Sequence, residues 1–124
     1  MKIVFISGKY SADSYEEIQD NIELARKVAV LCAQKGIGFF CPHTMTAQFS
    51  QRALGVKYSW YLELCKEYIT QLCSAGLMLP KWYESYGAAY EHELMVEYHI
   101  PIFHVNNALE LPQGLIRWYS RVRV

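Results

Sequence analysis

The sequence predicts a single α/β domain in which a parallel sheet is covered by helices on both faces. Four short apolar runs alternate along the 124 residues with segments whose apolar side chains recur every three or four positions. The apolar runs are typical of strands buried on both faces. The recurrence of apolar side chains every three or four positions is typical of helices that bury one side. Right-handed crossovers join this alternation into a parallel sheet. The expected strands are residues 2–7, 37–41, 75–80 and 100–105.

The first helix has recognisable ends. Its apolar positions begin at Ile18, and it is expected to start near Asp13 or Ser14, because both are good N-caps and two glutamates stand in the first turn. It is expected to end at Lys35, with Gly36 in the left-handed conformation that closes many helices.

The second half repeats the alternation after an irregular stretch. Pro42 stops the second strand, and residues 43–57 are expected to form a long loop, which in a compact domain often binds a ligand or forms a lid. Helical spacing returns at residues 58–72 and again from Glu84 or Ser85 to residue 99. Pro112 is expected in the first turn of a last helix that ends near residue 121.

Composition argues against several classes of partner. Lys plus Arg and Asp plus Glu number twelve each, so charge favours neither nucleic acid nor an anionic membrane. No apolar run is long enough to span a bilayer, and no secretory signal is expected. The four cysteines, Cys32, Cys41, Cys65 and Cys73, form no C-x-x-C pair, which predicts buried free thiols in a reducing cytoplasm. Without zinc spacing or phosphate-binding glycine motifs, neither a metal nor a cofactor is expected.

A carboxylate stands on the side of the third helix that should be buried. Glu91 is in register with an apolar stripe formed by Ala88, Leu94, Met95 and Tyr98. A buried carboxylate without a partner is costly. Glu91 therefore pairs with Lys81 or a tyrosine hydroxyl, lies at the edge of the stripe, or serves a functional site.

Polar residues follow the strands at one edge of the expected sheet. The expected strand order is 2-1-3-4, and a fifth strand is possible. In this order the direction of strand placement reverses between strands one and three, and in such sheets ligands bind beyond the carboxyl ends of the strands at the reversal. The loops carrying residues 8–10 and 82–85 would then face each other, with His43 within reach. Ser85 is a good N-cap near free amides that suit an anion. Gly8 and Gly87 allow close approach of a ligand, although an ordinary turn also explains Gly8.

Four short patterns run through this arrangement: G-K-Y, N-I-x-x-A, P-H and W-x-x-S-x-G-A-x-x-E. Together they resemble the nucleoside 2-deoxyribosyltransferase-like superfamily, and more closely its DUF4406 branch, over most of the first 105 residues. The S-x-G-x-x-x-E element is the specific part. The resemblance implies one Rossmann- or flavodoxin-like domain over residues 1–124. The matching residues are Gly8, Lys9, Tyr10, Asn21, Ile22, Ala25, Pro42, His43, Trp82, Ser85, Gly87, Ala88 and Glu91.

The resemblance also implies roles for these residues. Glu91 would be the nucleophile that attacks C1′ of a nucleoside or nucleotide and displaces the base, with the Tyr10 hydroxyl orienting it. Serine at position 85 is similar to members that act on nucleoside 5′-monophosphates, so a nucleotide is favoured over a free nucleoside. Trp82 could stack on the base. The other expected substrate-binding residues are Gly8, Lys9, His43, Ser85 and Gly87.

Several interpretations of function stay open. The first is an N-glycosidase or 2-deoxyribosyltransferase. The alternative is a nucleotide-binding or sensing module without turnover, because Ser74 stands where the family has Asp, Lys9 replaces a common proline, and Glu63 and Glu67 do not align with the acid that protonates the leaving base. A small interaction domain with a vestigial pocket is the third. The resemblance further implies a homodimer or larger assembly, with residues 45–57 and the aromatic side of the second helix as candidate interface.

Overall fold

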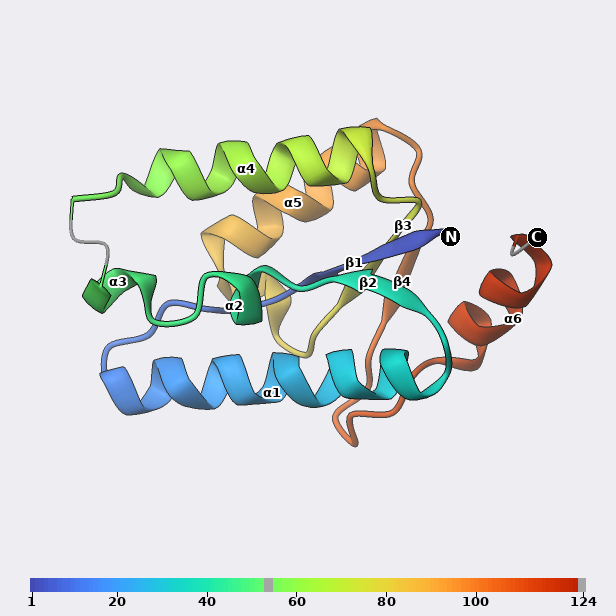
Figure 1. The fold of residues 1–124 in the computed structure, drawn as a ribbon, viewed down its shortest axis with the longest axis horizontal. Helices are drawn as coiled ribbons and strands as arrows, with labels where there is room; N and C mark the ends of the chain where they lie inside the picture. Colours follow the sequence, from blue (N-terminus) through green and yellow to red (C-terminus); the bar gives the residue numbers. More distant parts are fainter. Residues whose placement is uncertain (53–54, 123–124) are drawn as a thin grey trace.

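The computed structural model describes residues 1–52 and 55–122 and confirms a four-stranded parallel sheet in the order β2-β1-β3-β4 (Figure 1). Val4 pairs with Ala75 across the two central strands, and Gly76 pairs with Ile102 at one edge. The order reverses between β1 and β3, as expected. Within the described residues the sheet has no fifth strand. The strands are β1 (Ile3–Ser7), β2 (Gly38–Phe40), β3 (Ala75–Met78) and β4 (Ile102–His104).

Helices cover both faces of this sheet (Figure 1). On one face, α4 and α5 enclose a core around Phe5 and Met78. On the other, α1 and α6 enclose a core around Val4, Ile6 and Leu77. The helices are α1 (Tyr15–Gln34), α2 (Pro42–Met45), α3 (Phe49–Arg52), α4 (Tyr58–Gln71), the short η1 (Trp82–Glu84), α5 (Tyr86–Glu97) and α6 (Gln113–Val122).

The predicted ends of α1 are confirmed. The Ser14 hydroxyl accepts a hydrogen bond from the Glu17 amide at 3.1 Å, which caps the first turn. Gly36 has φ of 71°, the left-handed conformation expected after the last turn. Between these ends, Ile22 and Ala25 are buried, and Ala25 belongs to the core around Val4, Ile6 and Leu77.

The prediction of an irregular loop over residues 43–57 is wrong for two segments, because α2 and α3 lie within or beside it. Pro42 occupies the first turn of α2, where its fixed φ suits a helix and its missing amide is not needed. The Thr46 hydroxyl closes the turn by donating to the Pro42 carbonyl at 2.9 Å. Residues 53–54 of the expected loop lie outside the described residues.

The helix α5 ends earlier than the pattern predicts. His99 takes φ of 55° directly after the C-cap residue Tyr98. The Ile100 amide then donates to the Met95 carbonyl at 2.8 Å, and the His99 amide donates to Val96 at 3.1 Å, which closes the helix with paired backbone bonds. Tyr98 consequently leaves the apolar stripe and is 49% exposed.

The cysteines and the surface match the sequence in part. Cys32, Cys41 and Cys65 are buried, Cys73 is half-buried, and all four are free thiols. The reducing compartment that the free thiols suggest stays a prediction.

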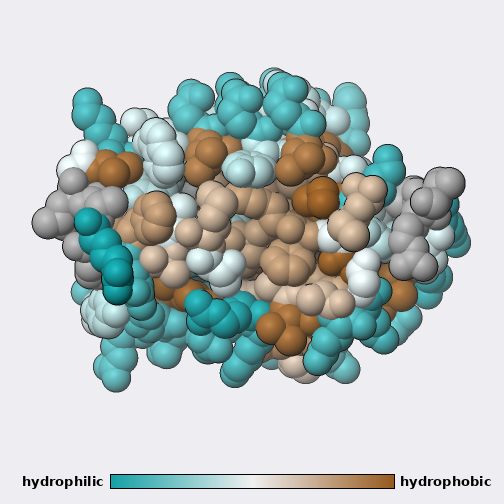
Figure 2. All heavy atoms as spheres, viewed as in Figure 1, coloured by the Kyte–Doolittle hydropathy of each residue, from teal (hydrophilic) through white to brown (hydrophobic). Residues whose placement is uncertain are grey.

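On the face of the molecule where β2 forms the near edge of the sheet, apolar residues form a band between two hydrophilic margins (Figure 2). In the part of the chain that the structure describes, no helix combines the length and the apolar character needed to cross a membrane.

Candidate functional site

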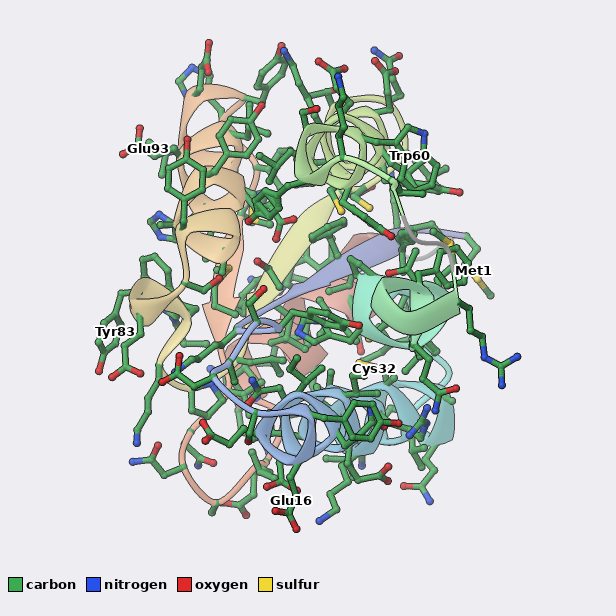
Figure 3. All side chains as sticks on the ribbon, turned by 90° about the vertical axis from the view of Figure 1, so that its left-hand side faces the viewer. Met1, Glu16, Cys32, Trp60, Tyr83 and Glu93 are labelled. Atoms are coloured by element: carbon green, nitrogen blue, oxygen red, sulfur yellow. The ribbon has the colours of Figure 1, made fainter. Side chains whose placement is uncertain are left out.

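A cavity of about 360 Å³ lies beyond the carboxyl ends of β1 and β3, where the strand order reverses. Figure 3 views the molecule from this edge, at which α4 and α5 begin. The volume falls within the range of about 300–1,000 Å³ that is typical of small-molecule sites. The wall is formed by Gly8, Tyr10, Ser11, Pro42, His43, Thr46, Phe49, Gly55, Val56, Tyr58, Tyr61, Leu62, Cys65, Ser85, Gly87, Ala88 and Glu91.

Glu91 lies in this wall with its carboxylate largely removed from solvent. Helix α5 directs it inward, so that only 8% of the residue is exposed. The Ser7 hydroxyl, at the end of β1, donates to Glu91 Oε1 at 2.6 Å. The partner is therefore Ser7, and neither Lys81 nor the tyrosine hydroxyl that the sequence suggested makes this bond. The short bond fixes the carboxylate between the central strand and the helix.

Burial raises the pKa of Glu91 to about 7, because water no longer solvates the charged form. Hydrogen bonds from Ser7 and from the Cys65 thiol act in the opposite direction and favour the carboxylate. Among the described wall residues there is no Lys or Arg to offset the charge. The described residues also contain no group of three or more potential His, Cys, Asp or Glu metal ligands. Glu91 is thus poised between its protonated and ionised forms near neutral pH.

His43 is buried in the wall, and its ring makes a hydrogen bond to the backbone of the segment after β1. Its Nε2 lies 3.0 Å from the Lys9 carbonyl, so this nitrogen carries the proton and donates. Burial lowers the pKa of His43, which favours the neutral ring. Its Nδ1 is then an acceptor, and it has no partner among the described residues. A neutral imidazole offers no positive charge to a phosphate.

Ser85 caps α5, as predicted. Its hydroxyl oxygen accepts from the Ala88 amide at 3.2 Å. The amides of Tyr86 and Gly87, in the first turn, have no acceptor within the helix. Ser85 and Gly87 line the cavity, so the start of α5, the positive end of its dipole, lies at the wall.

Gly87 has a structural explanation that the sequence could not supply. A Cβ atom on Gly87 would lie 2.6 Å from the Tyr58 hydroxyl oxygen. The missing side chain therefore makes room for Tyr58, which extends from the start of α4 toward the start of α5. The Tyr58 hydroxyl therefore lies close to the start of α5 beside the cavity, to which Gly87 also contributes.

Gly8 is likewise required by packing. A Cβ atom there would lie 2.6 to 2.9 Å from three carbons of Leu79, including the Leu79 Cβ, and Leu79 is buried. We expect Gly8→Ala to lower the free energy of unfolding by about 1–3 kcal/mol through overpacking. Urea denaturation measures this change. Gly114→Ala is the matched control, because its Cβ would meet Phe103 at 3.6 Å, an ordinary contact. Equal effects of the two substitutions would contradict the packing role of Gly8.

Two expected site residues lie outside the wall. Lys9 Nζ is 3.5 Å from Glu84 Oε1 at the surface. Trp82 is not among the wall residues, and one face of its indole stacks on His92, with ring centroids 4.2 Å apart and planes 13° apart. The structure brings together Gly8, Tyr10, His43, Ser85, Gly87 and Glu91.

The sequence does not single out several residues of the site. Ser7 lies outside the wall but holds Glu91, and its position as the polar end of an otherwise apolar strand is a usable signal. From α4, the wall takes Tyr58, Tyr61 and Cys65, which share one side of the helix by their spacing. Phe49 comes from α3, and its place depends on tertiary folding of a segment that showed no periodicity.

Comparison with known families covers this whole site. Residues 2–104 match the model of a family described as a domain of unknown function (DUF4406). The matched span includes every residue of the cavity wall and ends before α6. No curated protein matches the chain.

Proposed function

The chain belongs to the DUF4406 family, and we propose that its cavity binds a nucleoside 5′-monophosphate and cleaves the N-glycosidic bond through Glu91. The observation that carries this proposal is the buried carboxylate of Glu91, held at 2.6 Å by Ser7 in the wall of a cavity of ligand size. A carboxylate kept at the mouth of a parallel sheet, with no cationic partner in the described wall, is suited to chemistry on a bound ligand. The resemblance to nucleoside 2-deoxyribosyltransferase-like proteins supports the same reaction.

The proposed reaction proceeds in two displacements. A Glu91 carboxylate oxygen attacks C1′ of the sugar, the bond from C1′ to the base nitrogen breaks, and its electron pair leaves with the base. The base takes up a proton from solvent water, and the sugar remains as an ester on Glu91. Water, or a second base, then attacks C1′, the ester bond from C1′ to the Glu91 oxygen breaks and restores the carboxylate, and the proton of the attacking group returns to solvent. The hydrogen bond from Ser7 holds Glu91 in place through both displacements.

The wall suits the parts of a nucleotide. Tyr10, Phe49, Tyr58 and Tyr61 supply aromatic surface for a flat base. The free amides at the start of α5, next to Ser85, suit the 5′-phosphate. The neutral ring of His43 completes the wall on the side of α2.

A second candidate is a nucleotide-binding or sensing module without turnover. The observation that favours it is the lack of a second carboxylic acid to protonate the leaving base, because Glu91 is the single one among the described wall residues. Glu63 and Glu67 are exposed on α4 and contribute nothing to the wall. A poor leaving base would then depart slowly.

The expected homodimer also stays a proposal. The apolar band along the β2 edge supports it, because patches of this kind often mark contacts between proteins (Figure 2). Exposed apolar side chains of this molecule include Phe39, Met45 and Trp60.

The test is release of free base from a panel of deoxyribo- and ribonucleoside 5′-monophosphates and the matching nucleosides. Each compound is incubated with the full chain, with and without an acceptor base, and the products are separated by chromatography. We expect base release, with a nucleotide preferred over its nucleoside. Calorimetric binding without release would instead identify a binding module. If the protein neither binds nor cleaves any of these compounds, both candidates are contradicted.

A further inference from the structure

An ion pair joins two of the segments that contribute to the cavity wall. Lys9 is the chain neighbour of Gly8 and Tyr10, and both of these line the cavity. Glu84 directly precedes Ser85, which also lines the cavity. Lys9 Nζ lies 3.5 Å from Glu84 Oε1, so the pair links the segment after β1 to the segment before α5.

The charge of the wall restricts where a phosphate can bind. The described wall holds one carboxylate, Glu91, and no Lys or Arg. A phosphate deep in the cavity would be repelled by Glu91 and would lack a counter-charge. With the sugar against Glu91, the 5′-phosphate lies toward the edge of the wall beside Ser85, where the Lys9 ammonium is placed by its ion pair with Glu84.

The backbones that carry this pair are fixed, whereas the pair itself is replaceable. The Lys9 carbonyl accepts from buried His43 at 3.0 Å, and the next carbonyl, that of Tyr10, accepts from Asn21 at 3.0 Å. Glu84 lies in η1, which the stacking of Trp82 on His92 holds against α5. The side chains of Lys9 and Glu84 are 38% and 46% exposed, and exposed pairs of this kind are weak.

We propose that Lys9 recognises the 5′-phosphate of the substrate and that Glu84 competes with the phosphate for Lys9. This inference rests on the proposed function, because it assumes that the cavity holds a nucleotide. On binding, the Lys9 ammonium exchanges the Glu84 carboxylate for a phosphate oxygen, which carries more charge and lies beside the free amides of α5. Glu84 is thereby released to solvent. The ion pair keeps Lys9 in place at the wall when no nucleotide is bound.

Two substitutions should change nucleotide affinity in opposite directions. Lys9→Gln removes the cation, and we expect it to weaken nucleoside 5′-monophosphate binding about tenfold, since a charge-assisted contact is lost. Glu84→Gln removes the competitor, and we expect tighter binding by about two- to fivefold, the value of an exposed pair. Neither should alter the affinity for the matching nucleoside. Calorimetry with each of the four 2′-deoxynucleoside 5′-monophosphates and its nucleoside measures these ratios.

Lys57→Gln is the matched control for loss of a cation. Lys57 adjoins two wall residues in the chain, yet it lines a second hollow with Trp60 and Glu63. We expect the nucleotide affinity of Lys57→Gln to equal that of the wild type. An unchanged nucleotide-to-nucleoside ratio in Lys9→Gln, or weaker nucleotide binding in Glu84→Gln, would overturn the proposal while leaving the role of Glu91 intact. Absence of binding by every nucleotide and nucleoside would overturn both.

Discussion

Glu91→Gln should abolish the release of free base while nucleotide binding persists. The amide has nearly the same shape as the carboxyl group, and its oxygen can still accept the hydrogen bond from Ser7. It is not a nucleophile, so the glycosyl ester cannot form. We expect the rate of base release to fall by at least about 10³-fold, the scale on which removal of a covalent nucleophile acts. The initial rate with the preferred nucleotide, followed by chromatography, provides the measurement.

Glu93→Gln supplies the control for this substitution. Glu93 lies two residues further along α5, is exposed, and points away from the cavity (Figure 3). The same chemical change there should leave the rate and the affinity at wild-type values. Retention of full activity in Glu91→Gln would remove Glu91 as the nucleophile. A matching loss of nucleotide binding would assign Glu91 to binding and would favour the non-catalytic candidate.

The features of the fold that the sequence predicts are those encoded by periodicity. A strand such as β1 shows itself as an apolar run, and α1 shows itself by a stripe, an N-cap at Ser14 and a closing Gly36. The inward direction of Glu91 follows from the same spacing and was predictable. Helices α2 and α3 contain four residues each, too short for any helical period to be visible. They were missed for that reason.

The contacts within the site depend on tertiary packing and were not predictable. Ser7 and Glu91 are separated by 84 positions, and their bond requires that β1 end against the second turn of α5. The sequence offers a ligand or an ordinary turn for Gly8 and a ligand for Gly87, but it cannot show that Leu79 packs against Gly8 or that the Tyr58 hydroxyl lies beside Gly87. Trp82 lies next to the motif in sequence, but the left-handed Lys81 introduces η1 and the indole stacks on His92. A glycine or an aromatic residue in a sequence does not specify which neighbour will approach it.

The buried carboxylate should make the protein less stable as the pH rises. Glu91 has a pKa of about 7 in the folded chain and 4.5 as its ordinary value, so the folded state binds its proton more tightly than the unfolded state. Stability from this group is complete below pH 4.5 and is lost as the pH rises through 7. A difference of this size corresponds to about 3 kcal/mol. We therefore expect the free energy of unfolding of the wild type to fall by about that amount, relative to Glu91→Gln, between pH 4.5 and pH 8.

Urea denaturation of both proteins across this pH range measures the difference, because the comparison cancels the titration of every other group. Glu93→Gln should follow the wild type at each pH, since an exposed carboxylate ionises without loss of solvation. At pH 8, Glu91→Gln should be the more stable protein, although it is expected to be inactive. Parallel curves for the wild type and Glu91→Gln would mean that the folded chain solvates the charge of Glu91 as well as water does. The desolvated carboxylate on which the proposed reaction depends would then be absent.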